Sequence, residues 1–281
     1  MRKDHRILQM LLGILSLLIL LPVVLTILYS LFSPSEIKAF MHTRNIYGAS
    51  LMEIKLSPKP LSLGQYYNVL IEDMGILHYF SNSLLYTIGI LFGQALIIPA
   101  MAYALSRFEF HGREVLSFIV IILLLLPFQV TMVPNVLTLR SMGLMNTIWA
   151  VILPTVASPF YIFLLRQYMI SLPSDMFEAA QIDGAGPVHC FFSITLPVSR
   201  PMLGAAAALS FADCWNMVEQ PLAYLAERQD LYPLSLVFNQ LTQESTGIEF
   251  AGATLYLLPA LFVYLFFQND ILTGIQLSEL K

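Results

Sequence analysis

The chain has 281 residues, of which 57% are hydrophobic and only 11% are charged, and its formal net charge is −4. Soluble globular domains carry about 25% charged residues, so this composition excludes an ordinary cytosolic enzyme, a nucleic-acid-binding domain and a disordered chain. A membrane-spanning helix needs about 20 apolar residues, so about six of them would use close to half of the chain. The sequence therefore predicts an all-α integral membrane protein.

Six apolar runs have lengths that scatter around the roughly 17–25 residues of a membrane span. The first follows a short basic segment, is longer than the core of a signal peptide and lacks its small-residue cleavage site, so we expect an uncleaved first span. The six runs cover residues 7–29, 84–105, 116–137, 148–165, 202–222 and 252–267.

The positive charges indicate the orientation of these spans. An even number of spans places both termini on one side of the membrane. Of the 14 Lys and Arg residues, eight lie at the two ends and in the 106–115 and 166–201 loops, and six lie in the remaining loops. The positive-inside rule therefore predicts that both termini are cytoplasmic.

Acidic residues occur in the fifth run alone, where Asp213, Asn216 and Glu219 follow one another at a spacing of three. This spacing would place their side chains along one helical face. One interpretation is a polar stripe that lines a pathway or a gate. The alternative is that Glu219 lies at headgroup level and Asp213 caps an irregularity.

Other motifs are few. The pattern Gly89-xxx-Gly93 in the second run and Gly204 in the fifth allow close approach between helices. The two cysteines are 24 positions apart, the five histidines are scattered, and neither a P-loop nor a GxGxxG motif is present. We therefore expect no catalytic residues, no metal site and no cofactor.

The loop between residues 166 and 201 has the local chemistry of a short helix, a turn and a second short helix. Ser174 suits an N-cap, and Gly184 can take the left-handed conformation that ends a helix. Pro187 suits the first turn of the second helix, which we expect to be ended by two later prolines, Pro197 and Pro201. Such a helix pair can either dock on a partner or serve as a solvated connector.

The segment that begins Glu178-Ala-Ala-Gln-Ile-Asp-Gly-Ala-Gly, with Leu196-Pro197 after it, resembles the EAA signature of permease subunits of binding-protein-dependent ABC importers. In that family this loop is the coupling helix that docks in a cleft of the cytoplasmic ATPase. The resemblance implies a type I ABC importer permease fold with six spans. It also implies an ATPase-coupling role for Glu178, Ala179, Ala180, Asp183, Gly184, Leu196 and Pro197.

The resemblance extends from about residue 64 to 275, and its motifs are similar to those of the sugar-importer branch. The motifs include 82–83, 102–107, 110–113, 143–147, 163–166 and 215–216 with 221–222. The pattern of predicted spans resembles that of the shorter subunit of maltose-type and glycerol-phosphate-type importers. The resemblance implies a location in the membrane of a bacterial cell. The implied division is a first helix and extracytoplasmic loop (1–76), a transmembrane domain (77–270) and a cytoplasmic tail (271–281), in which Gly274 alone fits the family pattern.

The resemblance implies a transport subunit that passes a sugar or a related solute, with ATP hydrolysed by a partner. The implied partners are a cytoplasmic ATP-binding subunit, a second, different permease and an extracytoplasmic solute-binding protein, with no nucleic acid. The 223–249 loop is the candidate contact for the binding protein, through Glu227, Arg228, Asp230, Glu244 and Glu249.

Two other function classes fit the residues less well. A self-sufficient secondary transporter usually shows internal repeats and interrupted helices around buried ions, and this chain has no clear repeat and few intramembrane charges. A membrane-embedded enzyme needs a nucleophile–base pair or a metal constellation. No such group lies in two neighbouring runs.

Overall fold

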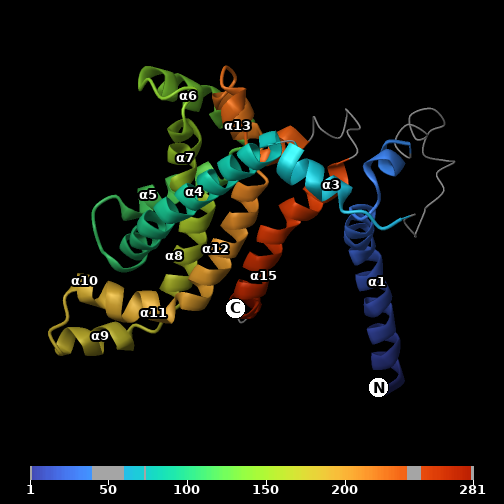
Figure 1. Ribbon diagram of the computed structural model, residues 1–281. Coiled ribbons are helices and arrows are strands. Elements are labelled where there is room, and N and C mark those ends of the chain that lie inside the picture. The colour runs from blue at the N-terminus through green and yellow to red at the C-terminus, as the bar shows by residue number, and fades with distance from the viewer. Residues whose placement is uncertain (1, 40–59, 73, 239–247, 280–281) are drawn as a thin grey trace. The chain divides into compact units, whose positions relative to one another are not determined.

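The computed structural model of the protein describes residues 2–39, 60–72, 74–238 and 248–279 (Figure 1). Within these ranges every regular element is a helix, which confirms the predicted all-α fold. In chain order the elements are α1 (Arg2–Tyr29), α3 (Gly64–Tyr67), η2 (Asn68–Glu72), α4 (Met74–Arg107), α5 (Arg113–Leu125), α6 (Phe128–Ser141), α7 (Ile148–Val156), α8 (Pro159–Ile170), α9 (Asp175–Ile182), α10 (Pro187–Cys190), η3 (Phe191–Thr195), α11 (Leu196–Val198), α12 (Arg200–Trp215), α13 (Glu219–Tyr224), η4 (Gln229–Leu231) and α15 (Glu249–Glu279).

Four helical stretches are long and apolar enough to cross a membrane: Leu8–Tyr29, Gly75–Arg107, Ile148–Ile170 and Glu249–Gly274. Two bent pairs qualify when each is counted as one span. These pairs are α5 with α6, bent by 110°, and Pro187–Val198 with α12, bent by 72°. The described residues therefore hold up to six candidate spans.

Three of the predicted runs are not single helices, and one of these, 148–165, is divided between α7 and α8, which together count as one candidate span. Run 116–137 breaks at Leu126, which is extended because the residue before a proline, here Pro127, is pushed out of the helical region. Run 202–222 stops at Trp215, and a separate helix, α13, begins at Glu219. The predicted tail from residue 271 continues α15 as far as Glu279.

The chain divides into two compact units. Unit 1 comprises residues 1–80 and 237–259, and unit 2 comprises residues 81–236 and 260–281. Unit 1 is organised around Gln65, whose fully buried amide donates hydrogen bonds to the carbonyl oxygens of Tyr29 at 2.7 Å and Phe32 at 2.9 Å. Since the last carbonyls of a helix have no partner within it, Gln65 satisfies the end of α1.

Small residues allow the helices of unit 2 to approach closely. A Cβ atom at Gly89 would lie 2.9 Å from Cδ1 of Ile152, and one at Gly93 would lie 2.7 Å from Cγ2 of Val156. Only glycine therefore fits between α4 and α7, which confirms the close approach expected from the Gly-xxx-Gly pattern. Gly204 on α12 is similarly covered by the side chain of Asp270 on α15.

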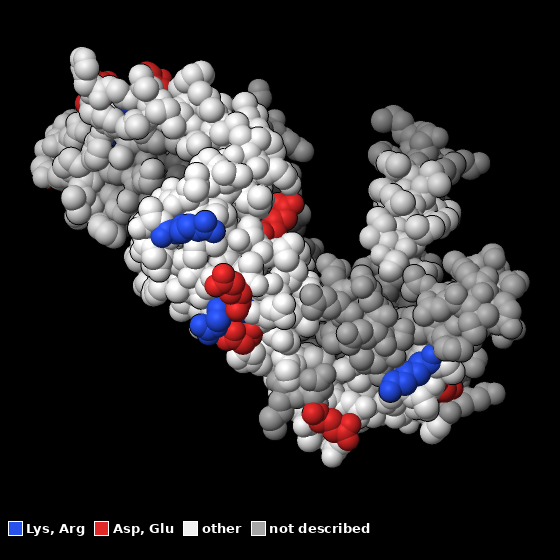
Figure 2. Space-filling model, turned by 90° about the horizontal axis from the view of Figure 1, so that it is seen from above, with Lys and Arg blue, Asp and Glu red and all other residues white. Residues whose placement is uncertain are grey.

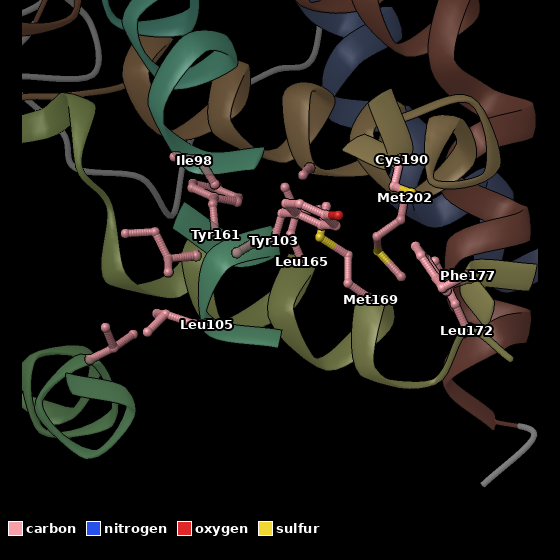
Figure 3. Close-up of a cluster of buried hydrophobic side chains, with 14 residues drawn as sticks. Ile98, Tyr103, Leu105, Tyr161, Leu165, Met169, Leu172, Phe177, Cys190 and Met202 are labelled. Carbon is pink, nitrogen blue, oxygen red and sulfur yellow. The ribbon is translucent and has the colours of Figure 1, made fainter. Parts of the chain in front are cut away.

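The main core of unit 2 is an apolar cluster to which α4, α5, α8, α9, α10 and α12 contribute (Figure 3). Its members are Ile98, Ala102, Tyr103, Leu105, Val120, Tyr161, Ile162, Leu165, Met169, Leu172, Phe177, Cys190, Met202 and Ala206.

Charge is sparse on the molecular surface. The face in Figure 2 shows a few acidic and basic side chains, some of them side by side, on an otherwise uncharged surface. Large apolar side chains such as Leu125, Phe262 and Phe266 are exposed. Because exposed apolar area of this extent is unfavourable in water, this surface suits lipid or other transmembrane helices.

Unit 2 has two distinct ends (Figure 1). Helices α9, α10 and α11 lie together at one end, and α6 and α13 lie at the other. At the first end, a Cβ atom at Gly274 of α15 would contact Ala205 of α12 at 3.1 Å, one turn along α15 from the contact between Asp270 and Gly204. The carboxyl-terminal part of α15 therefore runs toward the end that holds α9–α11.

Candidate coupling site

The 166–201 loop contains the predicted turn at Gly184. This residue has φ +81°, its N–H donates to the carbonyl of Gln181 at 3.0 Å, and the N–H of Ala185 donates to the carbonyl of Ala180 at 2.9 Å. These two bonds form a Schellman motif, in which the residue after the cap takes the left-handed conformation that glycine adopts without strain. The predicted helix end at Gly184 is confirmed.

The start of α9 differs from the prediction. Ser174 has helical angles (φ −65°, ψ −33°) and makes no capping hydrogen bond with its side chain, and its hydroxyl donates to Oδ1 of Asp175 at 3.4 Å. An N-cap side chain reaches the amides of the first turn only from an extended backbone. The first turn is held instead by the carbonyl of Ser174, which accepts from the N–H groups of Phe177 and Glu178 at 2.8 and 3.0 Å.

Helix α9 has one buried and one exposed face. Phe177 is 7% exposed within the apolar cluster, and Ala180 packs against that cluster. Glu178, Ala179 and Asp183 are exposed. The two alanines of the signature therefore do not form one docking face, because adjacent helical residues point about 100° apart.

Apolar side chains accompany the exposed carboxylates. Ile182 is 86% exposed, Val188 of α10 is 70% exposed and Phe192 of η3 is 62% exposed. Single exposed apolar residues are ordinary on a protein surface, but three within eleven positions of one loop are available for contact with a partner. Sequence reasoning did not name these three side chains, although each is a large apolar residue in a loop otherwise rich in turn formers.

Leu196 and Pro197 lie at the junction with α12. Pro197 occupies the first turn of α11, and the helical stretch continues to Val198, so Pro197 does not end the second helix as predicted. The chain bends by 72° between Val198 and Arg200, at Ser199. The bend falls there because Pro201 lies in the first turn of α12, where the missing N–H of a proline costs nothing.

The three polar residues of the fifth run do not share one helical face. Asp213 is exposed on α12, and its Oδ2 accepts a hydrogen bond from the hydroxyl of Tyr161 at 2.5 Å. Asn216 is the C-cap of α12, and its amide donates to the carbonyl of Ala212. Glu219 belongs to α13, so the end of α12 at Trp215 separates it from the other two.

At the end of unit 2 opposite α9, polar side chains of α4 hold the segment that follows α13. The amide of Asn82 donates to the carbonyl oxygens of Asp230 at 2.8 Å and Tyr232 at 3.0 Å. The hydroxyl of Tyr86 donates to the carbonyl of Leu231 at 2.8 Å, and the hydroxyl of Ser83 accepts from the N–H of Leu234 at 2.8 Å.

This segment presents charged side chains outward. Arg228 donates two hydrogen bonds of 2.8 Å to Asp230, and this pairing raises the pKa of the Arg228 guanidinium. Glu227 accepts a hydrogen bond of 3.0 Å from the amide of Asn146, which has φ +60°. Of the other two residues predicted to contact a binding protein, Glu249 lies at the start of α15 and Glu244 is outside the described residues.

Within the described ranges, no group of three or more His, Cys, Asp or Glu side chains could hold a metal ion.

The chain matches a known family over most of its length. The family is described as a binding-protein-dependent transport system inner membrane component, and the match covers residues 86–269, well over half of the chain. The chain belongs to this family.

Individual relatives agree with this membership. The arabinooligosaccharides transport system permease protein AraQ of Halalkalibacterium halodurans is 31% identical over 80% of this chain and 81% of its own length. The diacetylchitobiose uptake system permease protein NgcG of Streptomyces coelicolor is 36% identical over 71% of this chain and 68% of its own length. The crystal structure of a bacterial ABC transporter involved in the import of alginate matches with a TM-score of 0.77 and 23% identity, covering 95% of this chain and 96% of the matched chain.

The protein is therefore a multi-pass permease subunit of the inner membrane, from a binding-protein-dependent ABC importer. Membership implies three partners: a solute-binding protein, a second permease subunit and an ATP-binding subunit. The roles of the residues described above remain predictions, because a family and a fold do not assign individual side chains.

Proposed function

We propose that an ATP-hydrolysing partner drives this permease through α9 and that the transported solute is a sugar or a related compound. The observation that supports the coupling role is the division of α9 into two faces. Phe177 is buried in the cluster that joins α4, α8 and α12, while Glu178 and Ala179 are exposed. The names of two relatives, which transport arabinooligosaccharides and diacetylchitobiose, support the solute class.

The geometry suggests how the coupling works. Closure of the ATPase on ATP moves the docked face of α9, and the buried ring of Phe177 transmits this movement to the helices around it. Packed side chains transmit displacement because protein interiors are close-packed and hardly compressible. The bend at Ser199 then sets the angle at which the moving helix pair meets α12. Gly184 allows the tight turn between α9 and α10, and Asp183 adds charge to the docked face.

We propose a cytoplasmic location for the α9–α11 end and for both termini. The charge asymmetry of the loops supports this orientation, and the carboxyl-terminal part of α15 runs toward the same end as α9. A cysteine introduced at the exposed Ala179 would test it, because both native cysteines, Cys190 and Cys214, are buried. We expect a membrane-impermeant thiol reagent to label the A179C variant in inverted vesicles stripped of the ATPase but not in intact cells, and the reverse pattern would contradict the orientation.

We propose that Asp213 and Asn216 line the solute pathway and that Glu219 lies near its outer mouth. Supporting this, Asp213 is held in place by Tyr161 while its side chain remains exposed. A sugar hydroxyl would donate a hydrogen bond to such a carboxylate. We expect Asp213→Asn to raise the solute concentration needed for half-maximal uptake with little loss of protein from the membrane. Unchanged uptake kinetics would remove Asp213 from the pathway.

The test of the whole proposal is purification of the tagged protein from native membranes in mild detergent, with identification of its partners by mass spectrometry. We expect an ATPase, a second permease and a binding protein, whose sugar can then be found by screening. Recovery of the protein alone or as a homo-oligomer that still transports would contradict the coupling role and favour a self-sufficient transporter.

A further inference from the structure

The last turn of α4 contacts the helix pair of the coupling site through Arg107. The guanidinium Nη2 of this residue donates to the carbonyl oxygens of Met169 at 2.6 Å and Leu172 at 2.9 Å. Both carbonyls lie at or just beyond the end of α8, where the helix dipole and unpaired carbonyls favour a cation. The Cζ atom also lies 4.0 Å from the centroid of the Phe177 ring on α9. One half-buried side chain thus joins α4, α8 and α9.

A second residue, one turn earlier on the same face of α4, contacts the other helix. The hydroxyl of Tyr103 donates to the carbonyl of Pro187 at 3.1 Å, at the start of α10. Its ring lies 5.1 Å from the ring of Phe191, centroid to centroid, and Tyr103 is only 6% exposed (Figure 3). Since residues i and i+4 of a helix lie on one face, Tyr103 and Arg107 hold the two coupling helices to a single strip of α4.

We propose that Arg107 and Tyr103 are positioning residues that fix α9 and α10 to α4, so that the helix pair and α4 move as one body during transport. This inference rests on the coupling role proposed for α9. Neither residue belongs to the exposed face that would dock on the ATPase. Each contact is directional: the planar guanidinium combines two carbonyls with one aromatic face, a combination that a lysine cannot reproduce.

The contacts predict a defect in coupling, with docking preserved. Without Arg107, the exposed side chains of α9 can still meet the ATPase, but Phe177 and the end of α8 lose the group that joins them to α4. Movement of α9 would then be absorbed locally and would not reach α4. Tyr103→Phe removes one hydrogen bond and keeps the ring packing, so we expect it to act in the same direction with a smaller effect.

The experiment uses the complete importer, purified with its ATPase and second permease and reconstituted in vesicles. Wild type is compared with Arg107→Ala, Arg107→Lys, Tyr103→Phe and, as a matched control, Arg113→Ala. Arg113 is also an arginine at this end, but among the described residues its side chain donates hydrogen bonds to Glu114 and to the carbonyl of Phe108 and to none of the coupling helices. The measured quantities are the amount of assembled complex, basal ATP hydrolysis, its stimulation by the solute-loaded binding protein, and solute taken up per ATP.

For Arg107→Ala we expect basal hydrolysis per assembled complex close to wild type, with stimulation and uptake per ATP lower by about tenfold, the size expected when charged hydrogen bonds are lost. Arg107→Lys should keep part of the stimulation and uptake that Arg107→Ala loses. Arg113→Ala should show no loss of either. Where Arg107→Ala does not assemble, Tyr103→Phe decides the matter, with a loss of about threefold in stimulation expected from one neutral hydrogen bond.

Two results would overturn the inference. One is wild-type stimulation of ATP hydrolysis in both Arg107→Ala and Tyr103→Phe. The other is a loss of uptake and of basal hydrolysis in proportion to the amount of assembled complex, which is the result that a merely structural role would give. A wild-type preparation that contains no ATPase, or whose hydrolysis does not respond to the binding protein, would instead contradict the proposed coupling function itself.

Discussion

The two ends of unit 2 are attached to the same helix, α4, by different kinds of contact. At the coupling end, buried aromatic rings (Phe177 and Tyr103) and a guanidinium stacked on one of them add apolar packing to three hydrogen bonds with backbone carbonyls. At the opposite end, Asn82, Ser83 and Tyr86 hydrogen-bond to the backbone of residues 230–234. Arg107 follows Tyr86 by 21 positions on α4, which corresponds to about 32 Å along the helix axis.

The two kinds of attachment have different consequences for the residues that each end exposes. Close packing at the coupling end leaves α9 little freedom to move without its neighbours. Hydrogen bonds to backbone atoms at the other end fix the path of the segment but leave the side chains of Arg228 and Asp230 at the surface. Under the proposed function, one end would pass on a displacement and the other would hold a loop in shape for recognition.

The largest expected effect tests the buried side of the coupling end. Phe177→Ala removes a core aromatic ring, which costs about 3–5 kcal/mol in protein cores, so we expect loss of transport and a lower midpoint of thermal unfolding in detergent. The control is Phe192→Ala on the exposed side, which should leave the midpoint unchanged and weaken association with the ATPase. Equal midpoints for the two variants would show that the ring of Phe177 contributes no more to the packed core than an exposed ring does.

The next effect concerns the turn between the coupling helices. Gly184→Val places a β-branched residue at φ +81°, where L-residues cost about 1–2 kcal/mol, although the space around its Cβ is open. We expect transport to be abolished with the protein still in the membrane, as measured by uptake and immunoblot. Gly186→Val is the matched control, because φ −74° and ψ 166° suit valine. Normal uptake by the Gly184 variant would exclude a role for this turn.

The smallest effect tests the hydrogen-bonded end. Asn82→Ala removes two hydrogen bonds to backbone carbonyls, worth about 1–3 kcal/mol together. We expect basal ATP hydrolysis of the assembled importer to be retained, while the affinity for the binding protein falls. Gln268→Ala, which loses only a bond within its own helix, provides the control. An unchanged affinity would separate this loop from recognition of the binding protein.

The candidate site was only partly predictable from the sequence. The helix end at Gly184 could be predicted because its cause is local: glycine alone adopts positive φ without strain. Ser174 does precede the first residue of α9, but its side chain forms no capping bond, because the local preference of serine does not fix the backbone angle there. The shared face of Asp213 and Glu219 was wrong because periodicity assumes an unbroken helix, and this one ends at Trp215.

The sequence by itself determined the membrane class, the number of apolar runs and the resemblance of the 166–201 loop to a known signature, because these depend on composition and on residues close in the chain. Only the tertiary structure decided which face of α9 is buried, where the spans bend and how Tyr103 and Arg107 meet the coupling helices. These contacts join residues more than 60 positions apart, and no local pattern encodes such a distance, because it depends on how all the intervening helices pack.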